Sequence, residues 1–227
     1  MSESTPAAPQ PSQSVPSRRR VASSLAWAVP TVVAAAAAPA EAASPPPRID
    51  RVFSFRLDPT AAVDGTSVRA CATGSTRLSV TTNDDNSYYR ITNVQAGSTV
   101  TDVTASILVQ KSVVDAMGSQ NPLTWTNTTP SWSAPTREVS GTTPAVYTNN
   151  GIEYYRYNST LKTAVPAPVS GTITLPRIGW YSNCNTNLST QARNTGVMVN
   201  GRGSAVVNGM TLDNVGTYVR LTPRPAG

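Results

Sequence analysis

The chain has 227 residues, only 13% of them charged, with two cysteines, 19 prolines and no histidine. The lack of histidine excludes Ser-His and Cys-His nucleophilic sites, imidazole acid–base catalysis and His-ligated zinc. Scarce Glu and Lys argue against a coiled coil or long helical bundle. Close to a third of the residues are Ser, Thr or Asn, and Val, Tyr, Gly and Pro are frequent among the rest. This composition is typical of strands joined by turns, so we expect one all-β domain.

The first 42 residues have the order of an export signal. A polar stretch ends in three arginines at 18–20, and an uncharged, alanine-rich stretch follows at 21–40. The apolar part is interrupted by Pro30 and is shorter than the roughly 20 residues that a transmembrane helix needs. Small residues at 40–42 form an A-x-A cleavage site, so we predict a signal peptide that is removed after Ala42.

This leader resembles those of proteins exported by high-GC Gram-positive bacteria. Its segment Ser17-Arg18-Arg19-Arg20-Val21 also resembles a twin-arginine export signal. However, residues 21–23 replace the bulky residue and lysine of the stricter pattern, so a general secretory leader stays the alternative. The resemblance implies a secreted or cell-surface protein with no stable transmembrane segment in its mature chain. Beyond the predicted leader, 15 basic and 10 acidic side chains give a net charge of +5 that is spread without a basic cluster, so we expect no nucleic-acid partner.

The two cysteines, Cys71 and Cys184, both follow the predicted leader. An even count in an exported chain predicts one disulfide, and two free thiols are the alternative. Closing a loop of about 100 residues stabilises a fold by roughly 4–5 kcal/mol in the chain-entropy model. The bond would join an early strand to a late one.

Residues 43–50 form a proline-rich linker, and alternating or β-branched segments follow it. The patterns predict strands at 51–57, 68–72, 77–82, 87–92, 103–109, 146–148, 152–157, 172–175, 178–181, 197–199, 205–207 and 218–221. Turn residues at 83–86 and 149–151 predict two hairpins, and Asn-Gly pairs at 200–201 and 208–209 predict a meander. We expect one short helical turn at 112–117, no longer amphipathic helix, and a loop over most of 119–143.

Short strands with turn signals every 8–12 residues predict an antiparallel β-sandwich or barrel. We expect a single sandwich over residues 51–223, with two smaller ones divided near 119–143 as the alternative. The pattern resembles that of Ig-like secreted domains. The Cys-Trp-Cys spacing of a true immunoglobulin domain is absent, because 113 positions separate the cysteines.

The clearest binding candidates are Trp125 and Trp132, in the predicted loop. Exposed indoles beside Asn and Thr can stack on sugar rings, as in carbohydrate-binding modules. The alternative interpretation is that they close one end of the sandwich. Trp180 and the aromatic run at 154–157 are expected to pack in the sheets.

No motif in the chain predicts a catalytic site. Glycoside hydrolysis needs two carboxylates flanking a bond, and the spacing of the few acids singles out no pair. We expect an exported, non-catalytic structural or binding module without a metal or other cofactor. Its expected partner is a cell-wall polymer, a glycan or a surface protein. A carbohydrate-binding module and a secreted glycan- or wall-active enzyme are the alternatives.

Overall fold

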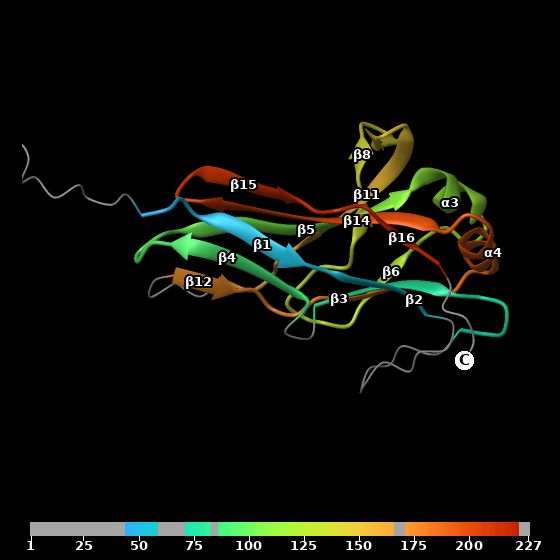
Figure 1. Ribbon diagram of the computed structural model, residues 1–227, viewed down its shortest axis with the longest axis horizontal. Coiled ribbons are helices and arrows are strands. Elements are labelled where there is room, and N and C mark those ends of the chain that lie inside the picture. Colours follow the sequence, from blue (N-terminus) through green and yellow to red (C-terminus); the bar gives the residue numbers. More distant parts are fainter. Residues whose placement is uncertain (1–43, 59–70, 83–85, 166–170, 223–227) are drawn as a thin grey trace, which may run out of the picture. The chain divides into compact units, whose positions relative to one another are not determined.

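A computed structural model describes residues 44–58, 71–82, 86–165 and 171–222. Strands dominate these residues (Figure 1). They are β1 (Arg48–Val52), β2 (Ser54–Asp58), β3 (Arg77–Thr81), β4 (Tyr88–Val94), β5 (Val100–Gln110), β6 (Trp125–Asn127), β7 (Thr136–Arg137), β8 (Val139–Ser140), β9 (Thr143–Pro144), β10 (Val146–Asn149), β11 (Ile152–Thr160), β12 (Gly171–Thr174), β13 (Gly179–Ser182), β14 (Val197–Val207), β15 (Met210–Val215) and β16 (Val219–Leu221). The two helices are α3 (Lys111–Ala116) and α4 (Thr186–Asn194).

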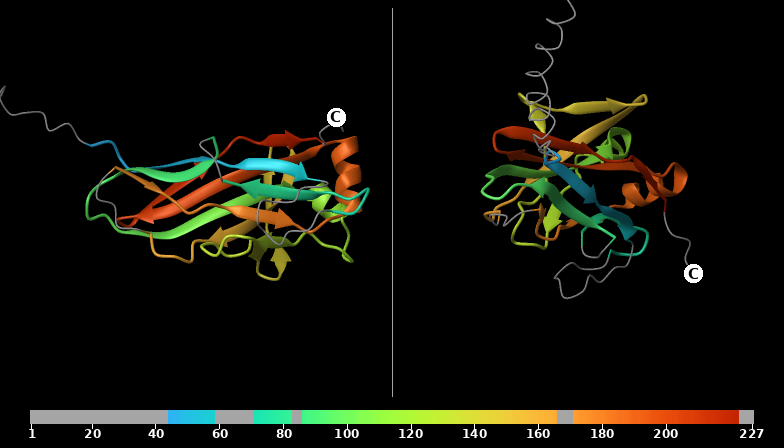
Figure 2. Two further views of the ribbon diagram at one scale, coloured as in Figure 1. Left: turned by 90° about the horizontal axis from the view of Figure 1, so that it is seen from below. Right: turned by 60° about the vertical axis from the view of Figure 1, so that its left-hand side comes forward.

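The strands form two facing layers, with β5 and β14 above β4 and β12 in Figure 1, and Figure 2 gives two further views. One layer is a seven-stranded sheet in the order β10-β11-β5-β14-β15, with β16 also paired to β14 and β7 to β11. The other consists of two sheets in the orders β1-β4-β12 and β2-β3-β13-β6. Every named pair is antiparallel. The prediction of an all-β antiparallel sandwich is confirmed.

The two sheets of the second layer continue one another. β3 pairs with β2, and β4 pairs with β1, so β3 and β4 run in one direction and do not pair with each other. The hairpin predicted around 83–86 is therefore wrong, and residues 83–85 lie outside the described ranges. The strands predicted at 172–175 and 178–181 likewise lie in line, as β12 and β13.

Hydrogen bonds connect the chain where the second layer is interrupted, between its two sheets. The Thr82 amide donates to the Ile178 carbonyl oxygen at 3.0 Å. In return, the Ile178 amide donates to Thr82 Oγ1 at 2.8 Å. Pro176 lies between β12 and β13 and has no amide hydrogen to donate to a strand ladder, which explains why strand pairing is interrupted here.

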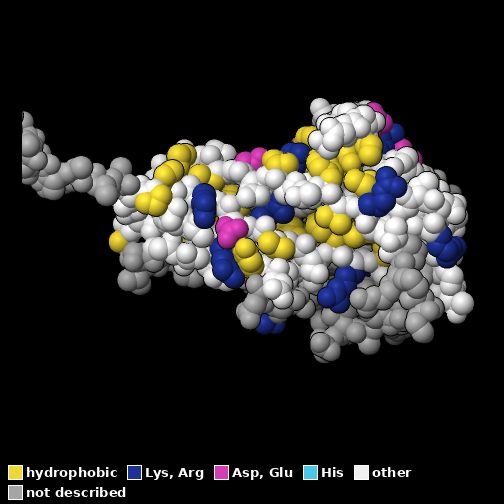
Figure 3. Space-filling model, in the orientation of Figure 1, with side chains coloured by type: hydrophobic (Ala, Val, Ile, Leu, Met, Phe, Trp, Pro, Cys, Tyr) yellow, Lys and Arg dark blue, Asp and Glu magenta, His cyan; other side chains and the backbone are white. Residues whose placement is uncertain are grey.

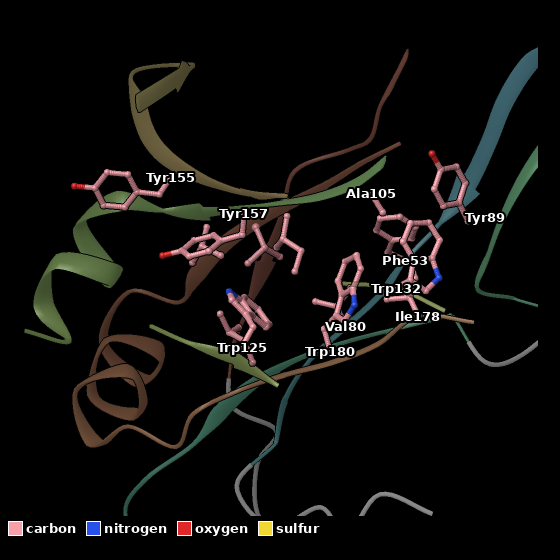
Figure 4. Packing of buried hydrophobic residues seen from close by; sticks show 14 of the residues in the cluster. Phe53, Val80, Tyr89, Ala105, Trp125, Trp132, Tyr155, Tyr157, Ile178 and Trp180 are labelled. Carbon is pink, nitrogen blue, oxygen red and sulfur yellow. The ribbon is translucent and has the colours of Figure 1, made fainter. Parts of the chain in front are cut away.

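One hydrophobic core fills the space between the layers, with members from Ile49 to Val207. Trp132 lies at its centre beside the interruption, stacked on Tyr89 at 5.9 Å and edge-on to Trp180 at 6.2 Å between ring centroids (Figure 4). Its Nε1 donates to the Pro176 carbonyl oxygen at 3.0 Å. Because Trp132 comes from the predicted loop, the core continues through that segment.

β14 is one continuous strand, so the turn predicted at Asn200-Gly201 is wrong. Glycine is required here by packing, because a Cβ on Gly201 would collide with the Phe53 ring. A Cβ on Gly203 would lie 2.8 Å from Tyr89. The predicted turn at 208–209 does form and leads into β15, with Asn208 at a φ of 50°.

The predicted helical turn at 112–117 corresponds to α3, and Gly118 follows it with a φ of 78°. The nine-residue α4 corrects the expectation that no longer helix forms. Asn185 caps it by accepting a hydrogen bond from the Leu188 amide at 3.0 Å. Leu188 and Ala192, four residues apart, are both fully buried against the core.

In the described part of the chain, no helix is long and apolar enough to span a membrane.

Candidate functional site

The outer edge of the seven-stranded sheet carries an excursion of the chain. β7 and β10 pair with the same side of β11, because β5 occupies its other side. Between them, residues 138–145 leave the sheet, and β8 and β9 form a small hairpin that stands out from the layer (Figures 1 and 2). We call residues 136–149 the projecting segment.

Backbone hydrogen bonds close the base of this excursion. The Ala145 amide donates to the Glu138 carbonyl oxygen at 3.0 Å, and the Glu138 amide donates to the Arg156 carbonyl oxygen at 2.8 Å. At the tip, Gly141 adopts a φ of 66°, which favours glycine. Pro144 has no amide hydrogen to donate, which helps to limit the β8–β9 ladder to two pairs.

A charged network ties the projecting segment to β11. Arg156 donates two hydrogen bonds to the Glu138 carboxylate, from Nε and from Nη2, and the second measures 2.7 Å. Tyr147 donates to the same carboxylate at 2.7 Å, and Asn158 donates at 3.1 Å. Asn158 in turn accepts a hydrogen bond from Ser106 of β5 at 2.8 Å. The network thus links the segment through β11 to the central strand of the sheet.

The network also sets the charge of its acid. The hydrogen bond from Arg156 lowers the pKa of Glu138 to about 2, with smaller contributions from Tyr147 and Asn158 and an opposing effect of burial. Only 24% of the Glu138 side chain and 26% of the Arg156 side chain are exposed. A general acid in glycoside hydrolysis needs a raised pKa, so the lowered pKa does not suit Glu138 to that role.

An aromatic pair lies on the same outer face of the sheet. Tyr154 and Tyr218 meet with ring centroids 4.8 Å apart. The side chain of Leu108, on the outward side of β5, is fully buried although the strand alternates as predicted. This face of the sheet therefore has a small packed layer of its own.

The projecting segment contributes no residue to the main hydrophobic core. It exposes two valines instead, with 59% of Val139 and 44% of Val146 accessible. In Figure 3 the tip is largely white, the colour of the backbone and of side chains that are neither hydrophobic nor charged, with yellow hydrophobic groups towards its base. An element that is firmly anchored, exposed and unnecessary to the core is a candidate contact surface.

Comparisons with models of known protein families, with curated proteins and with solved structures give no match.

The two tryptophans predicted as sugar-stacking residues lie in the core. Trp132 has no exposed surface and Trp125 only 9%. Trp125 packs edge-on against Tyr157 at 5.9 Å between ring centroids (Figure 4). A sugar needs an open ring face to stack on, and neither indole offers one, so the packing interpretation fits the structure.

The predicted disulfide between Cys71 and Cys184 is present. It joins chain segments next to β3 and β13, which are neighbours in one sheet, so it reinforces that sheet rather than linking the layers. Beside it, Thr76 and Asn185 exchange backbone hydrogen bonds at 3.3 and 2.9 Å. The early and late strands are therefore tied together at the start of α4.

A second charged cluster lies at α3. Lys111 forms an ion pair with Asp115 at 2.7 Å, and Tyr155 donates to the same carboxylate at 3.0 Å. Glu153 lies 4.0 Å from the lysine, and its side chain is 57% exposed. Across the described residues, no group of three or more His, Cys, Asp or Glu is placed to hold a metal ion.

Sequence reasoning missed Glu138, Arg156 and Tyr147 as a group. One signal was available, since alternation placed Arg156 on the face opposite Tyr155 and Tyr157. An arginine on the outward face of a strand can be stabilised by an acidic residue on a neighbouring strand. Which acid supplies it depends on the pairing of β7 with β11, and no local pattern predicts that pairing.

Proposed function

We propose that this protein is a non-catalytic binding or structural module that works outside the cytoplasm and contacts its partner through the projecting segment. The observation that carries the proposal is the separate anchoring of that segment. The Glu138–Arg156 ion pair holds it to β11, although it adds nothing to the hydrophobic core. Firm anchoring of an exposed element serves recognition, because less entropy is lost when a pre-ordered surface binds.

Two features support a place outside the cytoplasm. The disulfide is of a kind that persists in oxidising surroundings and is rare in the cytosol. The order of arginines, apolar residues and an A-x-A site in residues 1–42 is that of an export signal. We expect N-terminal sequencing of protein recovered from the culture medium or cell envelope to begin at Ala43. Recovery of the full chain from the cytosol with reduced cysteines would contradict this part of the proposal.

The chemistry of the segment favours an uncharged partner surface. Its tip presents the hydroxyl-bearing Ser140, Thr142 and Thr143. The valines at 139 and 146 add apolar area, and the only acid of the segment is neutralised by Arg156. Its one other charged residue, Arg137, lies at the base of the segment over the Tyr155 ring, away from the tip. A wall polysaccharide or a surface protein offers the matching hydrogen-bonding and apolar groups. We therefore propose a neutral region of the cell envelope as the partner.

The test compares two double variants in binding to cell envelopes purified from a high-GC Gram-positive bacterium. Val139→Ser with Val146→Ser alters the projecting segment. Val52→Ser with Val215→Ser is the matched control, because these valines are 43% and 52% exposed on β1 and β15. We expect sedimentation with the envelopes to fall only for the first pair, while both pairs keep the wild-type melting temperature.

Treating the envelopes with protease or with polysaccharide-degrading enzymes then separates a protein partner from a glycan. Equal loss of binding in both double variants would overturn the assignment of the segment. Release of soluble sugar or peptide fragments by the wild-type protein would overturn the non-catalytic proposal and favour a secreted wall-active enzyme.

A further inference from the structure

The chain contains three Asn-Gly dipeptides, at Asn150, Asn200 and Asn208, and the fold places them in three different settings. Asn-Gly is the sequence most open to spontaneous deamidation, because glycine has no Cβ to hinder attack by its own amide nitrogen. The same chemistry is therefore available at three positions, and only the surroundings differ. This comparison is independent of the proposed function.

Asn200 is held most tightly. It is fully buried in the middle of β14, where both neighbouring strands pair with it or with adjacent residues. Its side-chain nitrogen donates to the Gly216 carbonyl oxygen. The ring-forming step requires the asparagine side chain to swing over the following amide, and a buried strand residue has no room for that movement.

Asn208 is exposed but tied by its side chain. Its Oδ1 accepts a hydrogen bond from the Thr99 amide at 2.8 Å, and its Nδ2 donates to Ser98 Oγ at 3.0 Å. Its own amide donates to the Thr99 carbonyl oxygen at 3.0 Å. These bonds must break before the side chain can react, which lowers the population of reactive conformers.

Asn150 lacks such restraints. It is exposed at the tip of the β10–β11 hairpin, and its side chain has no hydrogen-bond partner among the described residues. It and Gly151 adopt φ values of 48° and 75°, as in a two-residue turn with both central residues left-handed. We propose that Asn150 is the site at which this protein deamidates, ahead of Asn208 and Asn200.

The reaction needs only water. The deprotonated amide nitrogen of Gly151 attacks Cγ of Asn150, a C–N bond forms, and the side-chain nitrogen leaves as ammonia. Water then opens the cyclic succinimide at either carbonyl, giving aspartate or isoaspartate, with no change in oxidation state. Isoaspartate inserts a methylene into the backbone, which the tight turn between Asn149 and Ile152 cannot absorb without losing register.

The consequence is local to one edge of the sheet. β10 carries Tyr147, which donates to Glu138, so a disturbed turn loosens the strand that completes the projecting segment. Deamidation to isoaspartate thus weakens the attachment of the projecting segment as the protein ages. The core and the disulfide are not touched.

The test incubates the purified folded protein at mildly alkaline pH and maps its peptides by mass spectrometry over time. Deamidation adds about one mass unit, and electron-transfer fragmentation separates aspartate from isoaspartate. We expect the Asn150 peptide to convert several-fold faster than the Asn208 peptide, with the Asn200 peptide unchanged. The same protein, reduced and unfolded in denaturant, is the control, and there we expect the three rates to converge.

Faster conversion at Asn208 or Asn200 in the folded protein would overturn the proposal. So would an unchanged Asn150 while the unfolded chain converts at all three positions. The variant Asn150→Asp, which carries the charge of the product without the extra methylene, should keep the melting temperature of the fresh protein. If the melting temperature of Asn150→Asp were lowered as much as that of the aged protein, the added charge and not isoaspartate would be what disturbs the turn. That result would contradict the loss of strand register inferred above.

Discussion

At the scale of single residues, polar groups buried between the sheets find hydrogen-bond partners on the backbone. Tyr89 is an example, because its ring lies in the core while its single hydroxyl hydrogen is shared between the Thr104 and Ser204 carbonyl oxygens, at 2.8 and 3.0 Å from the hydroxyl oxygen. The pairing of β5 with β14 shifts register just beyond this point, between Ser204 and Val206. Burial raises the pKa of the Tyr89 hydroxyl, which keeps it a donor at all ordinary pH values.

Gly203→Ala tests this close packing. A Cβ there would lie 2.8 Å from the Tyr89 ring, which the hydrogen bonding of its hydroxyl holds in place. We expect a loss of about 1–3 kcal/mol in the free energy of unfolding, as for other overpacked sites. Urea denaturation measures it, and a cycle with Tyr89→Leu isolates the clash. Strictly additive losses in the double variant would contradict the explanation.

Glu138→Gln tests the network of the projecting segment. The pKa of this carboxyl falls from 4.5 to about 2 on folding, chiefly through Arg156. Its contribution is therefore fully present above about pH 4.5 and is lost as the pH falls through about 2. After screening by solvent we expect it to be worth about 1 kcal/mol.

The measurement is the free energy of unfolding of wild type and variant between pH 7 and pH 2. The difference between the two proteins should shrink towards the acid end, because protonation removes from wild type what the substitution already removed. A constant difference across this range would mean that the carboxylate charge contributes nothing to stability.

At the scale of elements, the outer edge of the seven-stranded sheet consists of two short strands, which protects it from pairing with other chains. An uninterrupted edge strand offers a row of unpaired backbone groups to other chains. Here the edge is divided into β7 and β10, and the β8–β9 hairpin stands between them. The projecting segment thus leaves no long open edge for edge-to-edge pairing, in addition to its proposed role as a contact surface.

Replacing residues 139–144 by Asn-Gly tests whether the hairpin is dispensable to the fold. The Ala145 amide already donates to the Glu138 carbonyl oxygen at 3.0 Å, so a two-residue turn can join them. We expect a single cooperative transition with stability within about 1 kcal/mol of wild type, because surface loops away from the core carry little stability. Loss of cooperative thermal unfolding by circular dichroism would contradict this, and size-exclusion chromatography reports any new self-association.

The disulfide belongs to the same scale, because it ties the surroundings of β3 to those of β13. In Cys71→Ser with Cys184→Ser we expect a loss of about 4–5 kcal/mol, the chain-entropy value for a loop of this length. Denaturant unfolding of the double variant measures it, and reduced wild type should match. An unchanged midpoint in both would contradict a stabilising role.

At the scale of the whole molecule, the two layers share one core, and Trp132 is the residue that most clearly unites them. It contacts Tyr89 and Trp180 of one layer, and its backbone forms a bridge to Leu161 just after β11 of the other. For Trp132→Ala we expect a loss of about 3–5 kcal/mol, as for other large buried aromatic residues. A single transition in near- and far-ultraviolet circular dichroism should remain, whereas two separate transitions would mean that the layers fold independently.

Local features of the chain were predictable because they depend on neighbouring residues. Alternation over 103–109 predicted the inward face of β5, and Asn149-Asn150-Gly151 predicted the β10–β11 turn. The even cysteine count predicted the Cys71–Cys184 bond. Side-chain period and left-handed turn preferences are properties of a few adjacent residues, so they predict local structure wherever tertiary packing does not override them.

The tertiary structure decided what those same residues do. Asn200-Gly201 has the sequence of a turn but lies within β14, because Phe53 needs the space that a glycine leaves. Trp132, in a polar stretch typical of a loop, became the centre of the core.

The amino-acid composition, rich in turn and β-forming residues and without histidine, indicated an all-β chain and excluded imidazole chemistry. The candidate site arose only where strands distant in sequence paired. Glu138 meets Arg156 because β7 lies beside β11, and long-range pairing of this kind is set by the packing of the whole sandwich.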